Sequence, residues 1–457
     1  MNFVDRKDEQ SRLRRQMARS GGAFIVIYGR RRLGKSALIR QVLGDSDVYY
    51  MAEKSEMAVQ QSLLQRVMAD RCPAMQGMTF GSWESLLVTF NELCQPGCTL
   101  VLDEFPYLVR SCKSLPSTLQ KLLDSKQLRF NLIVCGSSQR MMQRLVLDAS
   151  EPLYGRADER MLLRPIAPVH WQRELQLSAA QAVEEYSVWG GVPRYWELRE
   201  REDSFEEALR RLVLHPNGLL YDEPAALFMD MEGSNQLLAS VMTALGAGFC
   251  QFSRLASAVG KKTTELSVPL KHLAEMAYVS KEVPFGEAEE KTKKTLYRIA
   301  DPFMAFYYRF VVPNKSLLAM GRIDRVWALI QEQMPDHVGQ HWETLCRQAV
   351  SGNTLCGHDW LLARRWWGKA LNKQGEAEQI ELDVVAESMD GKALLVGECK
   401  WNKADYSDRL LRELERKTRL LPFAKGKKVV PVLFLRERPL DAPAAPVFTP
   451  AEVMELL

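Results

Sequence analysis

Apolar residues in the first 165 positions form short runs that alternate with amphipathic segments. The run AFIVIYG, residues 23–29, is rich in β-branched and aromatic side chains and stops at a glycine, which is the pattern of a buried parallel strand. Similar strands are predicted at 47–53, 99–104 and 130–138. Helical patterns lie between them, at 36–43, 57–68, 82–94, 117–123 and 139–147. This alternation predicts an α/β fold with a doubly wound sheet over residues 1–165.

Helical patterns dominate after Pro165. The stretch 178–198 predicts a helix, a glycine stop and a second helix opened by Pro193, and we expect a helical lid over 166–232. Three short helices and a candidate β-hairpin follow within 233–312, in the order typical of a winged helix.

A last unit is predicted over residues 336–440. We expect a helix around 341–350, strands at 378–387 and 392–401, a helix at 405–420 and a strand at 428–435. This mixed order indicates a separate, small α/β domain.

The composition limits the classes of protein to which this chain can belong. The formal net charge of +4 over 457 residues neither requires nor excludes a nucleic-acid partner. Nine scattered cysteines without a paired CxxC favour reduced thiols, and His337 and His341 lack the further ligands of a known zinc pattern. The N-terminus has no apolar signal region, and no run of ~18 apolar residues occurs, so we expect a cytoplasmic protein without a membrane span.

The segment GRRRLGKS, residues 29–36, fits the pattern GxxxxGK[ST] between a predicted strand and a predicted helix. Glycines let the backbone N–H groups face a polyphosphate, the lysine reaches the β- and γ-phosphates of ATP, and the serine hydroxyl binds Mg²⁺. The three arginines are expected to face outward, as solvated charges or as groups that steer the nucleotide. The predicted ATP-binding residues are Gly29, Arg30, Arg31, Arg32, Leu33, Gly34, Lys35, Ser36 and Ala37.

An acidic pair ends the predicted strand TLVLDE, residues 99–104. At the carboxyl edge of the same sheet, Asp103 is expected to hold Mg²⁺ together with Ser36, and Glu104 to polarise the attacking water. Serines end the next strand, where Ser137 or Ser138 either senses the γ-phosphate or is ordinary loop chemistry.

Five stretches in order resemble the archaeal-type ATPase family, P-loop proteins of the AAA-like/STAND group. They are FIVIYGRRRLGKSALI, TLVLDEFPYL, LIVCGSSQRMM, PLYGRADERMLLRPI and WGGVPRYWEL. The resemblance extends through the winged-helix region and the last unit, so it covers nearly the whole chain. It implies that Arg156 is an arginine finger or sensor, acting in cis or from a neighbouring protomer of a homo-oligomer. The alternative is a structural arginine paired with Asp158 or Glu159. The resemblance also implies that GGVP, residues 190–193, contacts the nucleotide near its base, with Arg194 as a second sensor.

Basic residues occur in the second and third helices of the predicted winged helix and in its hairpin. Lysines and arginines along such a helix and wing would meet DNA phosphates, but the acidic stretch GEAEE offsets them. DNA contact and protein contact therefore both stay open. The residues concerned are Arg254, Lys261, Lys262, Lys271, Lys291, Lys293 and Lys294.

The stretch LLVGECKW, residues 394–401, places Glu398 and Lys400 two positions apart on a strand, so both side chains face one side. With Asp383 on the preceding strand they fit the D…ExK pattern of restriction-endonuclease-like, PD-(D/E)xK, domains. Asp383, Glu398 and an additional acidic residue, Glu343, are expected to hold Mg²⁺ or Mn²⁺ beside a phosphodiester, and Lys400 to activate water. The alternative is a degenerate nuclease fold kept for binding.

Together these patterns predict an ATPase built from a P-loop core, a helical lid, a winged helix and a nuclease-like domain. The expected function couples ATP and ADP states to a DNA-directed C-terminal domain. The alternative is a STAND-like signalling or scaffold ATPase whose C-terminal parts bind a partner protein.

Overall fold

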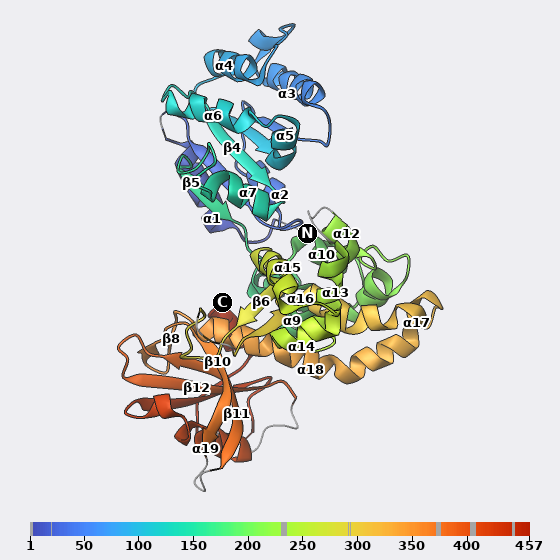
Figure 1. Ribbon diagram of the computed structural model, residues 1–457, viewed down its shortest axis with the longest axis vertical. Coiled ribbons are helices and arrows are strands. Elements are labelled where there is room, and N and C mark those ends of the chain that lie inside the picture. Colours follow the sequence, from blue (N-terminus) through green and yellow to red (C-terminus); the bar gives the residue numbers. More distant parts are fainter. Residues whose placement is uncertain are drawn as a thin grey trace. The chain divides into compact units, whose positions relative to one another are not determined.

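The computed structural model describes residues 3–19, 21–229, 235–290, 292, 294–371, 376–402, 408–440 and 444–457. The chain divides into two compact units, one up to Pro165 and one from Ile166 onward. Both units are shown in Figure 1, where elements are labelled as space allows. Within the described residues, no helix combines the length and the apolar character needed to cross a bilayer.

A five-stranded parallel sheet forms the centre of the first unit, in the order β2-β3-β4-β1-β5. Its strands are β1 Phe24–Tyr28, β2 Val48–Met51, β3 Thr99–Asp103, β4 Asn131–Gly136 and β5 Glu159–Leu162. The predicted α/β core with a parallel sheet is confirmed. The sequence did not predict β5, an edge strand that buries only alternate residues.

Helices connect these strands and cover the sheet (Figure 1). One face of the sheet packs against α3 to α6 through a continuous apolar core that includes Phe24, Val26, Leu100 and Leu132. The helices of this unit are α1 Lys7–Met17, α2 Lys35–Arg40, α3 Met57–Arg71, α4 Trp83–Leu93, α5 Phe105–Ser111, α6 Leu115–Asp124 and α7 Gln139–Leu147.

The second unit begins with helices, as the sequence predicts. Ser178 and Gln181 form a capping box that starts α9, and the chain leaves this helix at Gly190, whose φ of 61° suits glycine. The first helices are α8 Pro168–Glu174, α9 Ala179–Trp189, α10 Pro193–Arg199, α11 Phe205–Ala208 and α12 Glu223–Met229.

Three helices and a two-stranded antiparallel sheet follow, in the predicted order. We call the strands β6 and β7 and their connection the hairpin, residues 279–299. Lys291 and Lys293 lie outside the described residues. The elements are α13 Asn235–Gly246, α14 Phe252–Val259, α15 Thr263–Glu275, β6 Val279–Glu282 and β7 Leu296–Ile299.

A single long helix, α18 Ile323–Val350, leads into the last part of the chain. Two short helices, α16 Pro302–Phe306 and α17 Lys315–Ala319, precede it. Buried apolar residues continue along its whole length, from Val326 and Ile330 to Trp342 and Leu345. Residue 336, where the sequence predicts a new domain to start, therefore lies in the middle of a continuous helix.

The C-terminal sheet is mixed and has the strand order β10-β11-β12-β13-β14. The β10/β11 and β11/β12 pairs are antiparallel, whereas β12/β13 and β13/β14 are parallel. Helix α18 packs on one face, and the other face carries a second core that includes Leu414 of α19. The elements are β8 Thr354–Leu355, β9 His358–Asp359, β10 Arg364–Leu371, β11 Ala377–Glu387, β12 Ala393–Lys400, α19 Asp408–Arg419, β13 Lys428–Leu435, β14 Val447–Phe448 and α20 Pro450–Glu455.

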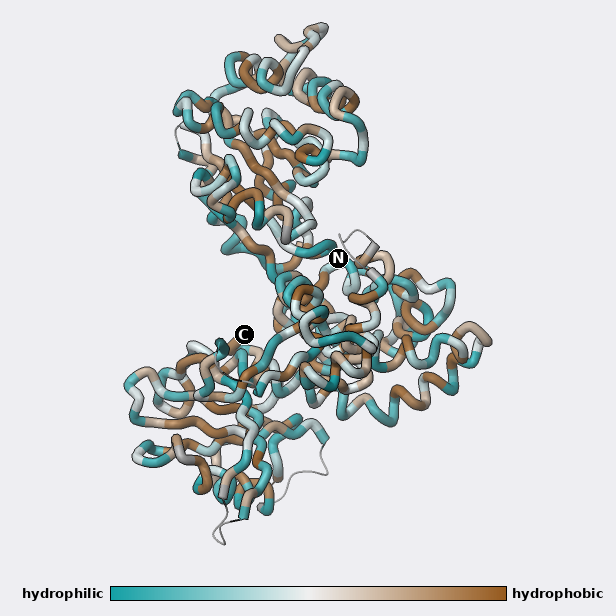
Figure 2. Tube along the Cα trace, in the orientation of Figure 1, coloured by the Kyte–Doolittle hydropathy of each residue, from teal (hydrophilic) through white to brown (hydrophobic). Residues whose placement is uncertain are grey.

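Hydrophobic residues concentrate along the strands of both large sheets (Figure 2). In the C-terminal sheet this reflects burial on both faces: Leu395 belongs to the core on the α18 face, and its neighbours Leu394 and Val396 belong to the core on the other face. Strands covered on both sides read as nearly continuous apolar runs, which is why the sequence revealed β12 and β13.

Candidate functional sites

The loop after β1 forms a tight backbone turn around Lys35. Gly29 and Gly34 have φ values of 155° and 83°, and a Cβ on Gly29 would lie 2.8 Å from the carbonyl oxygen of Leu163. Glycine is therefore required at both positions. The Nζ of Lys35 donates to the carbonyl oxygens of Gly29 at 2.8 Å and Arg30 at 3.0 Å. The ammonium group of Lys35 therefore lies against the backbone of the loop that precedes the residue.

Asp103, at the end of β3, is the best-connected polar group of this site. Its Oδ2 accepts from the Ser36 hydroxyl at 2.6 Å and from the Tyr49 hydroxyl. Its Oδ1 accepts from the Cys135 thiol at 2.7 Å and from the backbone N–H of Glu104 at 2.8 Å. Burial alone would raise the pKa of Asp103, but the bonds from Cys135, Ser36 and Tyr49 bring this pKa below the usual value. A serine hydroxyl and an ionised carboxylate in contact are oxygen ligands of the kind that Mg²⁺ prefers.

Electrostatics tie Lys35 to the acidic pair. Burial lowers the pKa of Lys35, while the charges of Glu104 and Asp103 act in the opposite direction. The lysine is thus a desolvated cation whose nearest compensating charges are the two residues that end β3. An anion bound in the loop would supply the missing negative charge.

Glu104 is held away from its strand in a left-handed conformation, with a φ of 50°. Its carboxylate accepts from the hydroxyl of Ser137 at 3.0 Å and from the backbone N–H of Ser137 at 3.2 Å. Ser137 therefore contacts the acidic pair, and its role as a γ-phosphate sensor stays a prediction. Ser138 instead precedes α7 as its cap residue.

The remaining predicted loop residues have distinct surroundings. Arg31 donates to the Ser137 hydroxyl at 3.4 Å and to the Tyr107 hydroxyl at 3.3 Å, so it faces the end of β4 and not only solvent. Leu33 and Arg30 are buried, and Arg32 has a positive φ of 67°. Ala37 lies in α2 directly after Ser36.

Arg156 makes a two-pronged ion pair with Asp124 of α6, with N–O distances of 2.8 and 2.9 Å. The sequence alternative of a structural pair with Asp158 or Glu159 is wrong in its partners. The Asp158 carboxylate accepts from the backbone N–H of Phe24, and Glu159 contacts Arg12. Because the carboxylates of Asp158 and Glu159 bind groups of β1 and α1, the guanidinium of Arg156 pairs with Asp124 instead.

Arg194, the other arginine that the resemblance singles out, lies in the second unit. It pairs with Glu197 one turn further along α10, at 3.0 Å. Both side chains are partly exposed, so this pair contributes little to stability.

Asp383 lies at an irregularity in the C-terminal sheet. The pairing of β10 with β11 shifts between Arg364 and Trp366, so the single residue Arg365 faces both Asp383 and Val384. Such bulges redirect side chains and are frequent beside active sites. The Asp383 carboxylate accepts from the backbone N–H of Cys399 on β12 at 2.8 Å.

Glu398 lies between two lysines. Lys400 contacts one carboxylate oxygen at 3.0 Å, and Lys417 of α19 contacts the other at 3.3 Å. Cys399 belongs to the core on the α18 face. Glu398 and Lys400 therefore face the α19 side of the sheet, as strand alternation requires.

Glu343 comes from α18, on the opposite face of the sheet. It pairs with Arg347 at 3.6 Å, and Arg347 also donates to the carbonyl oxygen of Asp383 at 2.9 Å. Among the described residues, no three acidic, histidine or cysteine side chains converge closely enough to hold a cation. The structure thus brings Asp383 near both Glu343 and Glu398, but it divides these two between opposite faces.

Both strand carboxylates have raised pKa values. For Asp383 the causes are burial and then the charge of Glu343; for Glu398 they are burial and then the charge of Asp383. Neighbouring lysines oppose the rise at Glu398. A cation placed between Asp383 and Glu398 would offset this repulsion, so the pair fits a divalent metal better than it fits two ionised acids alone.

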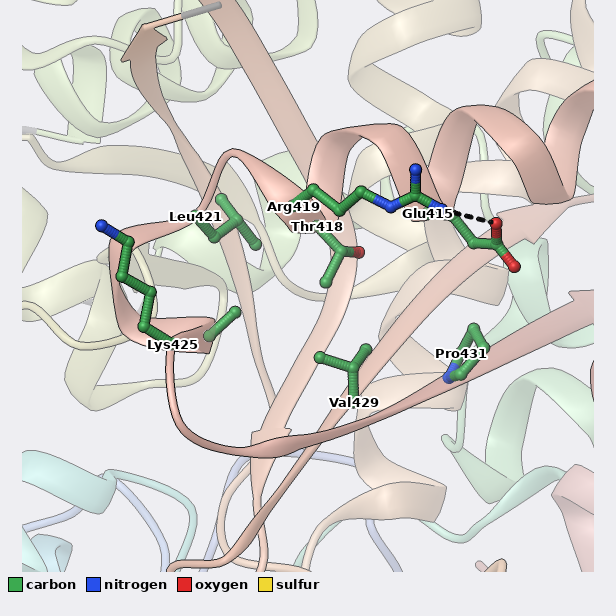
Figure 3. A pocket seen from close by; sticks show the side chains of 8 residues that line it. Glu415, Thr418, Arg419, Leu421, Lys425, Val429 and Pro431 are labelled. Atoms are coloured by element: carbon green, nitrogen blue, oxygen red, sulfur yellow. Dashed lines mark hydrogen bonds and ion pairs between the residues drawn. The ribbon is translucent and has the colours of Figure 1, made fainter. Parts of the chain in front are cut away.

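A pocket of about 380 Å³ opens on the C-terminal domain between the end of α19 and β13 (Figure 3). Its wall combines the apolar Leu421, Ala424, Val429 and Pro431 with Thr418, Lys425 and the ion pair of Arg419 with Glu415. None of the predicted site residues lines it. The lining residues are Glu415, Thr418, Arg419, Leu421, Ala424, Lys425, Val429 and Pro431.

Sequence reasoning missed several side chains that contact the predicted ones, among them Asp124, which pairs with Arg156. Tyr49 and Cys135 bind Asp103, while Arg347 and Lys417 reach Asp383 and Glu398. Tyr49 lies in the strand predicted at 47–53, but its contact with Asp103 depends on the pairing of β2 with β3, which the sequence did not predict.

Two segments of the chain match protein families, and one relative matches most of its length. Residues 3–197 match an ATPase domain found predominantly in Archaea, and residues 307–415 match a family of archaeal and bacterial proteins of unknown function. An uncharacterized protein of Methanocaldococcus jannaschii, MJECL04, is 28% identical over 433 residues, which cover 92% of this chain and 92% of that protein.

Two solved structures are also similar to this chain. The Walker-type ATPase PABY2304 of Pyrococcus abyssi has 19% sequence identity and a TM-score of 0.50, with 67% of this chain and 96% of that chain covered. The ORC2 protein of Aeropyrum pernix, solved as ADPNP–ADP complexes, has 16% identity and a TM-score of 0.45, with 70% and 97% covered. At this identity the first likeness shows the fold alone.

Proposed function

We propose that this protein hydrolyses ATP and couples its nucleotide state to a nucleic-acid-directed C-terminal domain, because residues 3–197 carry an archaeal-type P-loop ATPase domain. The observation that carries the first half is the contact between Ser36 and Asp103, which are 67 positions apart. That contact joins the phosphate loop to the acidic end of β3 in one polar site.

Lys35, Ser36 and Asp103 prepare this site for a nucleotide bound with magnesium. When bound, Mg²⁺ would supply positive charge to offset the charge that develops on the transferred phosphoryl group. Ser36 and Asp103 would hold the cation, and the residues from Gly29 to Ala37 would surround the phosphates with backbone N–H groups. Lys35 would exchange its two carbonyl partners for phosphate oxygens, which relieves its desolvation.

Glu104 is the residue we assign to the attacking water. Its Oε2 accepts from Ser137, which holds the carboxylate beside the end of β4, where it would polarise a bound water. Arg31 donates to the same serine hydroxyl and would change its contacts when a γ-phosphate binds there. Arg156, held by Asp124, is proposed to stabilise the transferring phosphate in cis or from a second protomer.

The C-terminal half of the proposal rests on Asp383, Glu398 and Lys400. The two carboxylates are buried together, and their pKa values are raised because their ionised forms are disfavoured. Mg²⁺ or Mn²⁺ bound between them would stabilise these ionised forms. A metal there would activate water and shield a scissile phosphate. Lys400 contacts Glu398 and would donate to the scissile phosphate.

One experiment tests both halves of the proposal. Purified protein is incubated with plasmid and single-stranded DNA in Mg²⁺ or Mn²⁺, with and without ATP, beside Lys35→Ala and Asp383→Ala. We expect Lys35→Ala to lose ATP hydrolysis and to change DNA binding or cleavage, and Asp383→Ala to lose cleavage alone. Equal cleavage by wild type and Asp383→Ala would refute the nuclease assignment. DNA behaviour unchanged in Lys35→Ala would refute the coupling.

A second function is favoured by the two lysines on Glu398. In a domain kept only for binding, these ion pairs would be permanent, and the ATPase would act as a STAND-like signalling or scaffold protein with a protein partner. A mobility-shift assay at two salt concentrations distinguishes the cases. A shift that weakens with salt supports nucleic acid, whereas no shift at low salt supports a protein partner.

A further inference from the structure

The hairpin packs against the C-terminal sheet within the second unit. Its Phe285 donates a backbone hydrogen bond to the carbonyl oxygen of Arg365 on β10, at 2.8 Å. The Phe285 ring packs on Phe423, with ring centroids 5.3 Å apart, and Phe423 also contacts Trp366. The wing of the predicted winged helix is thus an intramolecular lid on β10.

A cluster of charged residues lies at this contact. Glu282 ends β6, and its Oε2 lies 3.5 Å from Nε of Arg298 on β7 and 3.8 Å from Nη1 of Arg365 on β10. Arg365 also contacts Glu381, and it lies within electrostatic range of Glu343 and Arg347 of α18. Burial, followed by the charge of Arg298, lowers the pKa of Arg365, while the charges of Glu343 and Glu282 act in the opposite direction.

Hydrogen bonding in the cluster is incomplete. Glu282 Oε2, Arg298 Nε and both Nε and Nη1 of Arg365 are buried atoms without a hydrogen-bond partner in the protein. Buried guanidinium N–H groups that donate to nothing are costly, and native proteins rarely keep several together. Glu282 supplies charge to the two arginines, but its position does not satisfy their donors.

The position of the cluster indicates its ligand. Arg365 is the residue that faces the Asp383–Val384 bulge, and Arg347 donates to the carbonyl oxygen of Asp383. The arginines thus border the carboxylate that we assign to phosphodiester chemistry. Guanidinium groups are well suited to phosphate, because their fork of N–H donors matches its oxygens.

We propose that Arg298 and Arg365 form a binding site for a backbone phosphate of nucleic acid, and that Glu282 occupies this site as an internal substitute for the phosphate. One anionic group leaves as another enters, so the exchange preserves the charge balance of Arg298, Arg347 and Arg365 against the surrounding carboxylates. The phosphate adds acceptor oxygens that the carboxylate does not offer. The hairpin would then respond to DNA by releasing Glu282 while staying anchored through Phe285. This inference rests on the proposed nucleic-acid function.

Glu282→Gln tests the proposal in the full-length protein, with anisotropy of a fluorescein-labelled DNA duplex as the measurement. Removing the competing charge is expected to raise DNA affinity roughly tenfold and to steepen the dependence of log K on log salt by about 0.9 for each additional phosphate that the protein neutralises. Glu287→Gln is the matched control. Glu287 lies in the same hairpin, loses the same charge, and pairs with Lys294 of that hairpin at 2.9 Å.

Arginine variants identify the site. In Glu282→Gln/Arg365→Gln the increase in affinity should be lost, and Arg298→Gln in the Glu282→Gln background provides a second version should the sheet variant unfold. Equal affinity and salt slope for Glu282→Gln and Glu287→Gln would overturn the proposal, as would an increase that survives both arginine changes. Competition by inorganic phosphate as strong as by unlabelled DNA of equal phosphate content would assign the site to small anions instead. If wild type and every variant fail to bind DNA at low salt, the nucleic-acid function fails, and this inference fails with it.

Discussion

Single side chains from three different elements determine the state of Asp103. Ser36 comes from α2, Tyr49 from β2 and Cys135 from β4, and together they keep a buried carboxylate ionised. A fixed, ionised carboxylate is what a magnesium site needs before the metal arrives, since a carboxylic acid would first have to release its proton. The hydroxyl of Tyr49 thus belongs to the proposed magnesium site, although it is not expected to touch the nucleotide.

Tyr49→Phe is expected to raise the Mg²⁺ concentration needed for half-maximal ATP hydrolysis by about 3- to 10-fold, because one bond that holds Asp103 ionised is lost. A magnesium titration of hydrolysis at saturating ATP measures this. Tyr50→Phe is the matched control, because the Tyr50 hydroxyl bonds to Gln60, away from the acidic pair. An unchanged titration for Tyr49→Phe would contradict the positioning role.

Arg156 and Asp124 provide a test of the proposed finger. If Arg156 acts on the transferring phosphate, Arg156→Ala should lower kcat by about 10³-fold, the scale of an arginine finger, while Asp124→Ala leaves kcat near wild type. If the pair is structural, both variants should lose the same thermal stability and keep the same kcat. Steady-state hydrolysis and thermal unfolding of the two variants distinguish these outcomes.

Asp383 should make the stability of its domain depend on pH. Its pKa is raised in the folded protein, so the folded state retains a proton more strongly than the unfolded state. Stability from this group is then fully present below the unfolded pKa, near 4, and is lost as pH rises through the folded value. Asp383→Asn should therefore raise the unfolding temperature at pH 7 and make little difference below about pH 4.

Divalent metal gives an independent check on the same residue. Mn²⁺ or Mg²⁺ that binds between Asp383 and Glu398 should raise the unfolding temperature of wild type at pH 7 and have no such effect on Asp383→Asn. Equal stabilisation of both proteins would mean that the metal binds elsewhere, for example at Ser36 and Asp103.

At the scale of elements, glycines in two helices have opposite surroundings. Gly339 lies inside α18, where an added Cβ would meet the Trp401 side chain at 3.9 Å, an ordinary contact. Gly246 ends α13, where the same atom would lie 2.7 Å from Tyr308. Helix α18 can accept a side chain at this turn, and α13 cannot.

Gly339→Ala is therefore expected to stabilise the second unit by about 0.5–1 kcal/mol, because alanine loses less backbone entropy in a helix. Gly246→Ala should destabilise it by about 1–3 kcal/mol through overpacking. Denaturant unfolding of the two variants measures both. If both variants change the free energy of unfolding in the same direction, either helix propensity alone or packing alone determines the effect at both sites.

Elements that depend on local pattern could be predicted from the sequence, and those set by distant pairing could not. The phosphate loop and the strands that carry Asp103 and Glu398 depend on short apolar runs and on fixed spacings of glycine, lysine and acids. The edge strand β5 and the partner of Arg156 depend on which segments meet in the fold. For the same reason Lys417 was missed: α19 was predicted, but its contact with Glu398 depends on how it packs on the sheet.

At the scale of the whole molecule, the two proposed chemistries belong to separate compact units. The phosphate loop and its acidic pair lie before Pro165, whereas Asp383, Glu398 and the hairpin lie after it. Any influence of ATP on DNA must therefore pass from one unit to the other. Lys35→Ala and the Glu282→Gln hairpin variant act at the two ends of that coupling, and their double-mutant cycle in DNA affinity would measure it.

The continuous helix α18 restricts how the chain can be divided. A fragment that begins at residue 336 would keep the buried Trp342 and Leu345 but lose Val326, Trp327 and Ile330, and its new N-terminus would expose four backbone N–H groups in the middle of a former helix. A fragment that begins between the hairpin and Ile323 keeps the helix whole, but it leaves behind the hairpin that covers Arg365. The C-terminal domain therefore has no clean point of excision. Gene fusions, limited proteolysis and isolated-domain assays should all meet that constraint.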